Sequence, residues 1–403
     1  MDLLGEKFSK LGVKNAPGQE IRQVTKEIEF RGEKIWGKPV DFSHGDVDAF
    51  EPIPGTLDQF VNGVKLGGEQ AYTEYRGKQI IREDLAKKLS IFTGTSISTD
   101  KELMITPGTQ GALFLAMGSV IGRGDKVAIV VPDYFANRKI AEFFDAEIIP
   151  IRLNYLESDK NAGLDLMQLE DAFKAGVKVF LFSNPNNPTG VIYSPVEIRT
   201  IASLAQKYGV AVIVDELYSR QIFDGRMYTH LCAQDIQPDN LITIMGPSKT
   251  ESLSGYRLGV AFGSSKIIAR MEKLQAIVSL RAPGYSQAVL KLWFNEPTGW
   301  IENRIAAHQS IRDDLLALLR SVEGVEARTT EAGSYLFPKI PNLTVNIEDF
   351  VKILRLQANV TVTPGTEFGS QFTDSFRINF SQDHKSALHA IERTIQLIER
   401  YQK

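Results

Sequence analysis

Short apolar runs alternate with amphipathic stretches between about residues 100 and 265 of the chain. The runs are rich in Val and Ile and carry almost no polar positions, as in strands that are buried on both faces. They cover residues 126–131, 146–153, 177–183, 209–216, 240–246 and 258–264. Stretches with helical spacing, such as residues 195–209, lie between them. This alternation predicts an α/β fold with a mostly parallel sheet that helices cover on both sides.

The two ends of the chain have a different pattern. Residues 1–40 are charged and mixed, which we interpret as an arm and a helix. A long helical pattern over residues 264–279 leads out of the central block, and short strands such as 335–340 and 376–381 follow among helices. Because 403 residues exceed the length of one simple core, we predict a second α+β domain, to which we expect the N-terminal arm to return.

Charge and cysteine content argue against several classes of protein. The net charge is −3, with 46 basic and 49 acidic residues, so no basic excess favours nucleic acid. The single cysteine, Cys232, excludes an intramolecular disulfide, and the five histidines show no metal-ligand spacing. The N-terminus lacks the apolar run of a secretory signal, and no stretch approaches the roughly 20 apolar residues of a spanning helix. We expect a cytoplasmic protein with no metal, membrane or nucleic-acid partner.

Polar residues follow the apolar runs, at the edge where ligands bind in an open parallel sheet. Lys249 comes just after residues 240–246, in a loop of small residues. A desolvated lysine is a nucleophile, although a solvated loop lysine is the ordinary alternative. Arg257 lies eight residues further on, and its planar fork suits a phosphate, which the Ser248 hydroxyl could also bind. The combined block is more specific than any of these residues alone.

Asp215 lies at the end of the run at 209–216, and Tyr218 follows the run. A carboxylate there is either a helix cap or a group with a partner. If a pyridine nitrogen is that partner, Asp215 keeps the ring protonated as an electron sink, and Tyr218 can hydrogen-bond the ring phenolate. The segment 183–190 is either a simple turn or a rigid loop that points Asn187 at a ligand oxygen. We predict a cis peptide bond between Asn187 and Pro188.

Three further parts of the sequence each allow a functional and a structural interpretation. Gly108, Thr109 and Gln110 precede an apolar helix, whose first N–H groups would form an anion site. Tyr134 could stack on a flat heterocycle or be a rim or core aromatic. Arg377 lies between Phe376 and Ile378 in an alternating strand, so it needs an anion, either a structural carboxylate or a substrate carboxylate.

Taken together, these motifs resemble the class I and II aminotransferases of the fold-type I pyridoxal-phosphate (PLP) superfamily, the relatives of aspartate aminotransferase. The resemblance spans roughly residue 40 to the C-terminus, and the joint order of the motifs is specific although each is weak. The ordered series is AYTEYRG (71–77), TPGTQGAL (106–113), VVPDYF (130–135), SNPNNPTG (183–190), VDELY (214–218), PSKTESLSGYRLG (247–259), PGTEFG (365–370) and FRINFS (376–381).

The resemblance implies a large PLP-binding domain over residues 46–290, with a mostly parallel seven-stranded sheet between helices. The smaller α+β domain then combines residues 1–45 with residues 291–403. The cofactor is pyridoxal 5'-phosphate. The implied activity moves the amino group of an α-amino acid to a 2-oxo acid by a ping-pong mechanism, with active sites at the interface of a homodimer. A PLP-dependent lyase, synthase or other enzyme of Cα chemistry is the alternative on the same fold.

The resemblance also implies residue roles. Lys249 forms a Schiff base (aldimine) with the cofactor and moves the substrate Cα proton, Asp215 pairs with the pyridine nitrogen, and Tyr134 stacks on the ring. Asn187 and Tyr218 contact the phenolic oxygen of the ring. The phosphate is held by the residues near the first helix turn and the lysine loop, namely Gly108, Thr109, Gln110, Ser248 and Arg257, with Tyr72 reaching it from the other subunit. On the substrate side lie Gly45, Asn187 and Arg377, the last binding the α-carboxylate.

Three positions depart from the common pattern of the resemblance. Many members carry a serine where this chain has Gly246, so one phosphate contact is missing or supplied otherwise. His44 precedes Gly45 where apolar residues are frequent. Arg281 lies in a loop that often lines the site, where it would receive an acidic substrate side chain or lie on the surface.

Overall fold

A seven-stranded sheet forms the centre of the computed structural model, which describes residues 28–45, 47–235 and 238–403. The strand order is β2-β8-β7-β6-β5-β3-β4, and β8 is antiparallel to its two neighbours. The remaining pairs are parallel, so the predicted mostly parallel sheet is confirmed. The strands are β2 (Leu103–Pro107), β3 (Lys126–Val131), β4 (Glu147–Arg152), β5 (Val179–Ser183), β6 (Ala211–Asp215), β7 (Leu241–Met245) and β8 (Leu258–Gly263).

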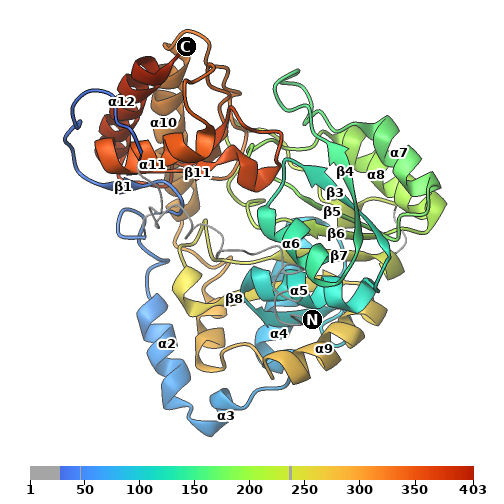
Figure 1. Cartoon of the computed structure of the whole chain (residues 1–403). Coiled ribbons are helices and arrows are strands. Elements are labelled where there is room, and N and C mark those ends of the chain that lie inside the picture. Colours follow the sequence, from blue (N-terminus) through green and yellow to red (C-terminus); the bar gives the residue numbers. More distant parts are fainter. Residues whose placement is uncertain (1–27, 46, 236–237) are drawn as a thin grey trace, which may run out of the picture.

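Helices cover both faces of this sheet, which explains the unbroken apolar runs. On β5, Phe180 and Phe182 pack with α7 (Leu166–Lys174) and α8 (Pro195–Tyr208) on one face. Val179 and Leu181 pack on the other face with α5 (Gly108–Val120), α6 (Phe135–Phe143) and α9 (Ser265–Val278). Figure 1 shows the sheet between these two groups of helices. Alternate side chains of one strand therefore enter two separate cores.

Another hydrophobic core, distinct from the two at the sheet, lies in the C-terminal part of the chain. It is built by α10 (Trp300–Arg320), α11 (Ile347–Ala358) and α12 (His384–Tyr401), drawn in orange to red in Figure 1. These helices pack on a three-stranded antiparallel sheet of β11 (Thr363–Pro364), β12 (Phe376–Asn379) and β9 (Tyr335–Leu336). We call this part of the molecule the C-terminal body.

The described N-terminal segment returns to the C-terminal body. β1 (Val40–Asp41) pairs in parallel with β10 (Val360–Thr361), and Val40 and Phe42 are buried in the same core as α10 to α12. The arm and helix that we expected at the start of the chain fall largely on residues 1–27, which lie outside the described residues.

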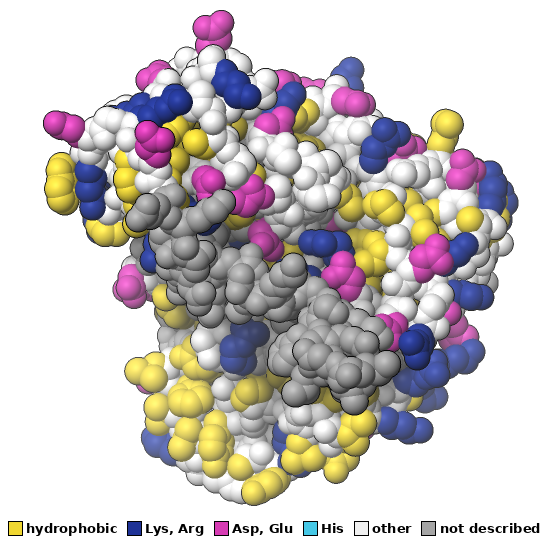
Figure 2. All heavy atoms as spheres, viewed as in Figure 1, with side chains coloured by type: hydrophobic (Ala, Val, Ile, Leu, Met, Phe, Trp, Pro, Cys, Tyr) yellow, Lys and Arg dark blue, Asp and Glu magenta, His cyan; other side chains and the backbone are white. Residues whose placement is uncertain are grey.

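Two short helices leave an apolar surface at the base of the molecule. They are α2 (Thr56–Lys65) and α3 (Gly68–Ala71), and α4 (Gln79–Thr93) follows them against β2 and β8. Leu57, Val61, Val64 and Leu66 are exposed on or next to α2. Figure 2 shows hydrophobic side chains gathered over α2 and α3, at the lower left. We call Leu57, Val61, Val64 and Leu66 the α2 patch.

Strand register brings the polar residues of the lysine loop and the neighbouring turns to one edge of the sheet. Ser183, at the end of β5, pairs with Asp215 at the end of β6. β7 ends at Met245, four residues before Lys249. Since Pro107 pairs with Leu258, Arg257 lies beside the first turn of α5. Residues that are up to 150 positions apart in sequence thus meet at one edge.

The predicted cis bond between Asn187 and Pro188 is wrong. The cis peptide bonds precede Pro132 and Pro185, so the cis bond in this loop lies three residues earlier, directly after β5. The later turn is closed by Asn186, whose carbonyl accepts from the Gly190 N–H and whose side-chain oxygen accepts from the Thr189 N–H and hydroxyl. These bonds hold the turn with a trans Asn187–Pro188 bond.

None of the helices within the described ranges combines the length and apolar character needed to span a lipid bilayer. Within the same ranges, no three His, Cys, Asp or Glu side chains cluster as metal ligands.

Candidate active site

Two adjoining cavities lie between the sheet edge and the C-terminal body, and they meet at Lys249. The inner cavity, of about 220 Å³, is lined by residues of the sheet-edge loops and by two residues of the C-terminal body, Tyr335 and Arg377. The outer cavity, of about 500 Å³, reaches towards β1 and the start of α12. Both are lined by Tyr218, Ser248, Lys249 and Ser254. Most of the predicted site residues line the inner cavity, namely Thr109, Gln110, Tyr134, Asn187, Asp215, Tyr218, Ser248, Lys249, Arg257 and Arg377.

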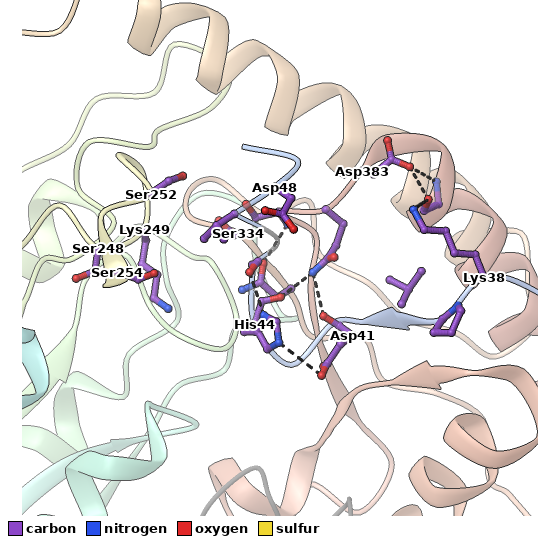
Figure 3. Close-up of a pocket in the computed structure, with 18 of the residues that line it drawn as sticks. Lys38, Asp41, His44, Asp48, Ser248, Lys249, Ser252, Ser254, Ser334 and Asp383 are labelled. Carbon is purple, nitrogen blue, oxygen red and sulfur yellow. Dashed lines mark hydrogen bonds and ion pairs between the residues drawn. The ribbon is translucent and has the colours of Figure 1, made fainter. Parts of the chain in front are cut away.

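The side chain of Lys249 stands at the junction of the cavities. Its amine makes no hydrogen bond or ion pair with any residue of the described ranges. Figure 3 shows it with Ser248, Ser252 and Ser254 on one side of the outer cavity. A lysine amine without a protein partner, facing a cavity, is placed to react with a ligand carbonyl group.

Asp215 is a buried carboxyl group that pairs with no cation among the described residues. It is 7% exposed, and one of its oxygens accepts a hydrogen bond of 3.1 Å from the Leu217 N–H. Burial raises the pKa of Asp215 to about 7, and the neighbouring Glu216 adds to the rise. A cationic N–H donor in the inner cavity would reverse this shift, because it favours the charged carboxylate.

One end of the inner cavity is built to hold an anion. α5 starts at Gly108 without a side-chain cap, so its first N–H groups point to the cavity that Thr109 and Gln110 line. Arg257 lies so close that a Cβ atom on Gly108 would stand 2.5 Å from its Nη2 atom. Gly108 also has φ +75°, so this position needs a glycine both for its backbone conformation and for the approach of the guanidinium group.

Close packing accounts for the departure at Gly246. A Cβ atom at this position would lie 2.8 Å from Cγ2 of Thr109 and 3.2 Å from Cα of Gly259. A serine would therefore displace the first turn of α5. Ser254, which sequence reasoning did not select, lines the same cavity and offers a hydroxyl group instead.

Arg377 on β12 is a buried cation that has no carboxylate partner in the described part of the chain. It is 5% exposed and donates to Oδ1 of Asn187 at 3.0 Å and to the Ser43 carbonyl at 2.9 Å, while its Nε has no partner. The rings of Tyr335 and Phe368 lie 4.4 and 5.1 Å from the guanidinium carbon. Of the two anions that the sequence left open, the structural carboxylate is absent, and a ligand carboxylate fits.

Tyr134 and Gly45 line different cavities. Tyr134 lines the inner cavity, donates its hydroxyl to Oε1 of Gln110 at 3.0 Å, and has its pKa raised to about 12 by burial. Gly45 lines the outer cavity, where a Cβ atom would meet Ser381 at 3.3 Å. Figure 3 shows His44 and Asp41 beside it, facing each other across an ion pair of 3.6 Å.

Tyr72 does not line either cavity of its own chain. Its side chain is 78% exposed, next to α3. The guanidinium carbon of Arg281 lies 5.3 Å from the Tyr72 ring and 5.7 Å from the Tyr75 ring. The buried Nε of Arg281 has no hydrogen-bond partner within the described residues.

Comparisons with known proteins agree with this site. The family model "Aminotransferase class I and II" matches residues 40–393. The chain belongs to this family. It is therefore a PLP-dependent aminotransferase, which moves an amino group between an amino acid and an oxo acid.

Several of the similar proteins bear aminotransferase names. A solved structure of an aspartate aminotransferase from Rhodobacter sphaeroides 2.4.1 is 60% identical, with a TM-score of 0.94 over 99% of this chain and 100% of that chain. The aspartate aminotransferase of Sulfolobus acidocaldarius is 27% identical over 94% of this chain and 92% of its own. An N-succinyldiaminopimelate aminotransferase from Mycobacterium tuberculosis, at 22% identity and a TM-score of 0.81, shares the fold over 89% of this chain and 93% of its own.

The residues of this aminotransferase fit pyridoxal phosphate on three independent observations. The buried Asp215 has no cation in the described residues, which suits a protonated pyridine nitrogen. The glycine that lets Arg257 approach the start of α5 forms a cradle for a phosphate. The amine of Lys249 has no protein partner, as a covalent bond to the cofactor requires.

Sequence reasoning did not select several residues that line the inner cavity. Phe135, Ser183 and Ser254 lie within the quoted motifs, whereas Ser43 and Tyr335 lie outside them. Tyr335 fell within a predicted strand of the C-terminal body, and nothing in its local pattern distinguishes it from a core aromatic. Only the packing of that body against the sheet edge brings it to the site.

Proposed function

We propose that the inner cavity holds the cofactor and the outer cavity receives the substrate, with Lys249 bonded to the cofactor at their junction. One observation carries this assignment. A cavity of about 220 Å³ is shared by an amine with no partner, a buried carboxyl with no cation, a helix start that can bind an anion and an arginine with no carboxylate partner, all judged within the described residues. The roles of Asn187, Tyr218 and Tyr134 follow from their places on the same wall. Gly108, Thr109, Gln110, Ser248 and Arg257 would bind the phosphate, and Ser254 would add the hydroxyl that Gly246 lacks.

The chain's own residues then divide the chemistry. When bound, pyridoxal phosphate supplies a conjugated ring that accepts the electron pair of the substrate Cα–H bond. Asp215 keeps a proton on the ring nitrogen, and Arg377 orients the substrate through its α-carboxylate. Nζ of Lys249 would take the Cα proton of the substrate as a general base and return a proton on the cofactor side. We propose that the two half-reactions follow each other in ping-pong order.

We propose aspartate as the amino donor. The support is the name of the Rhodobacter sphaeroides relative at 60% identity, together with several aspartate aminotransferases at lower identity. Arg281 offers a cation for the side-chain carboxylate, since its Nε is without a partner and its head rests on Tyr72. Because Tyr72 lies outside its own cavities, we place both residues at the site of a partner subunit.

This placement requires a homodimer, which we propose forms through the α2 patch and the adjoining surface at Tyr72. Exposed apolar side chains gathered on one surface are typical of subunit interfaces. Mixing the Lys249→Ala and Tyr72→Ala variants tests the arrangement, because a hybrid dimer would contain one intact site. Activity that stays absent after mixing and refolding together would contradict a shared site.

We also propose the two-domain division at residues 46–290 and at 1–45 with 291–403. Its support is the core of the C-terminal body, whose fully buried members come from residues 40–42 and 311–401 apart from Phe223. A cytoplasmic location stays a prediction from the sequence.

The absorption spectrum of the purified protein is the first test of the function. A yellow band from cofactor on Lys249 should bleach on adding aspartate alone and return on adding a 2-oxo acid. The Lys249→Ala variant should lose turnover entirely. Bleaching with release of ammonia or carbon dioxide would instead favour the lyase or synthase reading, and full activity of Lys249→Ala would refute the assignment.

The donor is tested by replacing Arg281. Arg281→Ala should lower kcat/KM for aspartate by roughly tenfold to hundredfold, as expected for one lost charge-assisted pair, and leave alanine within about twofold. Arg199→Ala, which removes an exposed arginine on α8, is the matched control. Equal losses of kcat/KM for aspartate and alanine would show that Arg281 does not bind the side-chain carboxylate of the substrate.

A further inference from the structure

Two tyrosine hydroxyl groups meet at the inner cavity, one from each part of the molecule. Oη of Tyr218, just after β6, lies 2.6 Å from Oη of Tyr335 on β9. The two rings stand edge to face, with centroids 5.4 Å apart and an interplanar angle of 77°. Both residues are 4% exposed, and both line the inner cavity. A buried hydroxyl contact of this length is a hydrogen bond that one of the two groups must donate.

The proposed function determines which group donates. Tyr218 is the one placed at the phenolic oxygen of the cofactor. Burial, and next the Tyr335 phenol, raise the pKa of Tyr218 well above its usual range, so it keeps its single hydrogen. That hydrogen can serve either Tyr335 or the cofactor, not both.

We propose that Tyr335 is a positioning residue that donates its hydroxyl hydrogen to Tyr218 and so directs the Tyr218 hydrogen to the phenolic oxygen of the cofactor. The inference rests on the proposed cofactor site and adds a residue to it. The relay strengthens the Tyr218 donor, because hydrogen bonds in a chain polarise one another.

The backbone and ring of Tyr335 are fixed, so its hydroxyl group has one direction. Tyr335 pairs with Asn379 of β12, and its carbonyl accepts a bond of 2.8 Å from the Thr330 hydroxyl. Its ring lies 4.4 Å from the guanidinium carbon of Arg377. One side chain therefore supports the substrate-carboxylate site with its ring and the cofactor oxygen with its hydroxyl group.

A hydrogen-bond donor at the phenolic oxygen stabilises the negative charge of that oxygen. The nitrogen that joins Lys249 to the cofactor then holds its proton less tightly, so its pKa is lower. The pKa of that nitrogen, read from the absorption band as pH is varied, reports on the relay without turnover. We assume that the hydrogen bond from Tyr335 strengthens the bond from Tyr218 to the cofactor by about 10–30%. Tyr335→Phe should then raise this spectral pKa by about 0.2–0.5. Tyr218→Phe removes the donor itself and should raise it more.

A double-mutant cycle separates an effect through Tyr218 from a general disturbance. In the Tyr218→Phe background, Tyr335→Phe should add no further shift. Tyr155→Phe is the matched control, because it deletes a buried phenol hydroxyl that donates to a backbone carbonyl and lines neither cavity. It should leave the spectral pKa unchanged.

The ring is tested separately from the hydroxyl group. Tyr335→Phe keeps the ring under Arg377 and should leave KM for the amino acid within about twofold, whereas Tyr335→Leu should raise it roughly tenfold. An unchanged or lowered spectral pKa in Tyr335→Phe, or shifts that simply add in the cycle, would overturn the inference. If Tyr218→Phe itself gives no shift, or no band arises from Lys249, the proposed cofactor site fails instead.

Discussion

The buried carboxyl group of Asp215 makes the stability of the protein without cofactor depend on pH in a defined way. Its pKa rises from 3.8 to about 7 in the folded chain, with burial as the first cause. A carboxyl group whose pKa is higher in the folded than in the unfolded protein binds its proton more tightly in the folded state. Its contribution to stability is therefore complete below about pH 4 and is lost as pH rises through about 7. Asp215→Asn removes this dependence.

The size of the effect follows from the shift. About three pKa units at about 1.4 kcal/mol each give an upper bound of about 4 kcal/mol for burying the charged carboxylate above neutral pH. The Asn oxygen can still accept from the Leu217 N–H, and its amide nitrogen faces the cavity. Allowing for imperfect replacement, we expect Asp215→Asn to stabilise the cofactor-free protein by about 1–3 kcal/mol at pH 8, or roughly 2–5 °C in Tm.

Thermal unfolding of the cofactor-free protein between about pH 5 and 8, at fixed protein concentration, measures this directly. The wild-type and Asp215→Asn curves should lie closer together at the acid end and separate further as pH rises. Glu323→Gln, at an exposed position after α10, should run parallel to wild type. Burial is the first cause that raises the pKa of Asp133 to about 7, and this burial is common to all three proteins, whereas the smaller contribution from the Asp215 charge is lost in Asp215→Asn. Parallel wild-type and Asp215→Asn curves would refute the argument.

Adding pyridoxal phosphate should reverse the order of stability. The protonated ring nitrogen gives wild-type Asp215 the cation that it lacks, and Asn offers no charge to pair with it. The wild-type protein should therefore gain more Tm from the cofactor than Asp215→Asn gains. A larger gain by the variant would mean that Asp215 does not face the ring nitrogen.

Two further predictions concern the anion sites. Gly108→Ala would place a methyl group 2.5 Å from Nη2 of Arg257, so cofactor affinity measured by absorbance titration should fall at least about tenfold. Gly124 has a positive φ like Gly108, but a Cβ atom there would meet open space, so Gly124→Ala should lower stability without lowering cofactor affinity. If both variants lost cofactor affinity equally, backbone strain and not the contact with Arg257 would be the cause. Arg377→Lys should raise KM for both amino acid and oxo acid by roughly tenfold to hundredfold with the cofactor spectrum unchanged, and an unaltered KM would exclude it as the carboxylate site.

The central sheet could be predicted from sequence because its strands are buried on both faces. The run at 177–183 is apolar from Val179 to Phe182, and after the charged Lys178 it forms β5 within two residues of the predicted start. β2 was missed as a strand because its five residues run straight into the glycine turn of α5, which dominates the local pattern. The cis bond was assigned to the wrong proline because sequence shows which residues can form a turn, and not which bond the backbone needs to reverse.

Some residues of the candidate site could also be predicted from the sequence, and others could not. Residues at strand ends could be predicted, since the topology of a parallel sheet brings Asp215 and Lys249 to one edge. Whether Arg377 had a carboxylate partner could not be predicted, because the answer depends on every side chain within reach in the folded chain. The role of Ser254 depends likewise on the close contact of Gly246 with Thr109, which no spacing along the sequence reveals.

The two parts of the molecule contribute different functions to one cavity. In the proposed assignment, the sheet edge supplies the groups for the cofactor, whereas β12 of the C-terminal body supplies Arg377 for the substrate. If no residue linked the two parts, the position of the cofactor groups would not depend on the position of the substrate group. Tyr335 joins them, because its ring lies against Arg377 while its hydroxyl group meets Tyr218. A change in how the C-terminal body sits on the sheet must therefore alter the substrate site and the cofactor oxygen together, which makes this contact the place where substrate binding can be sensed by the cofactor.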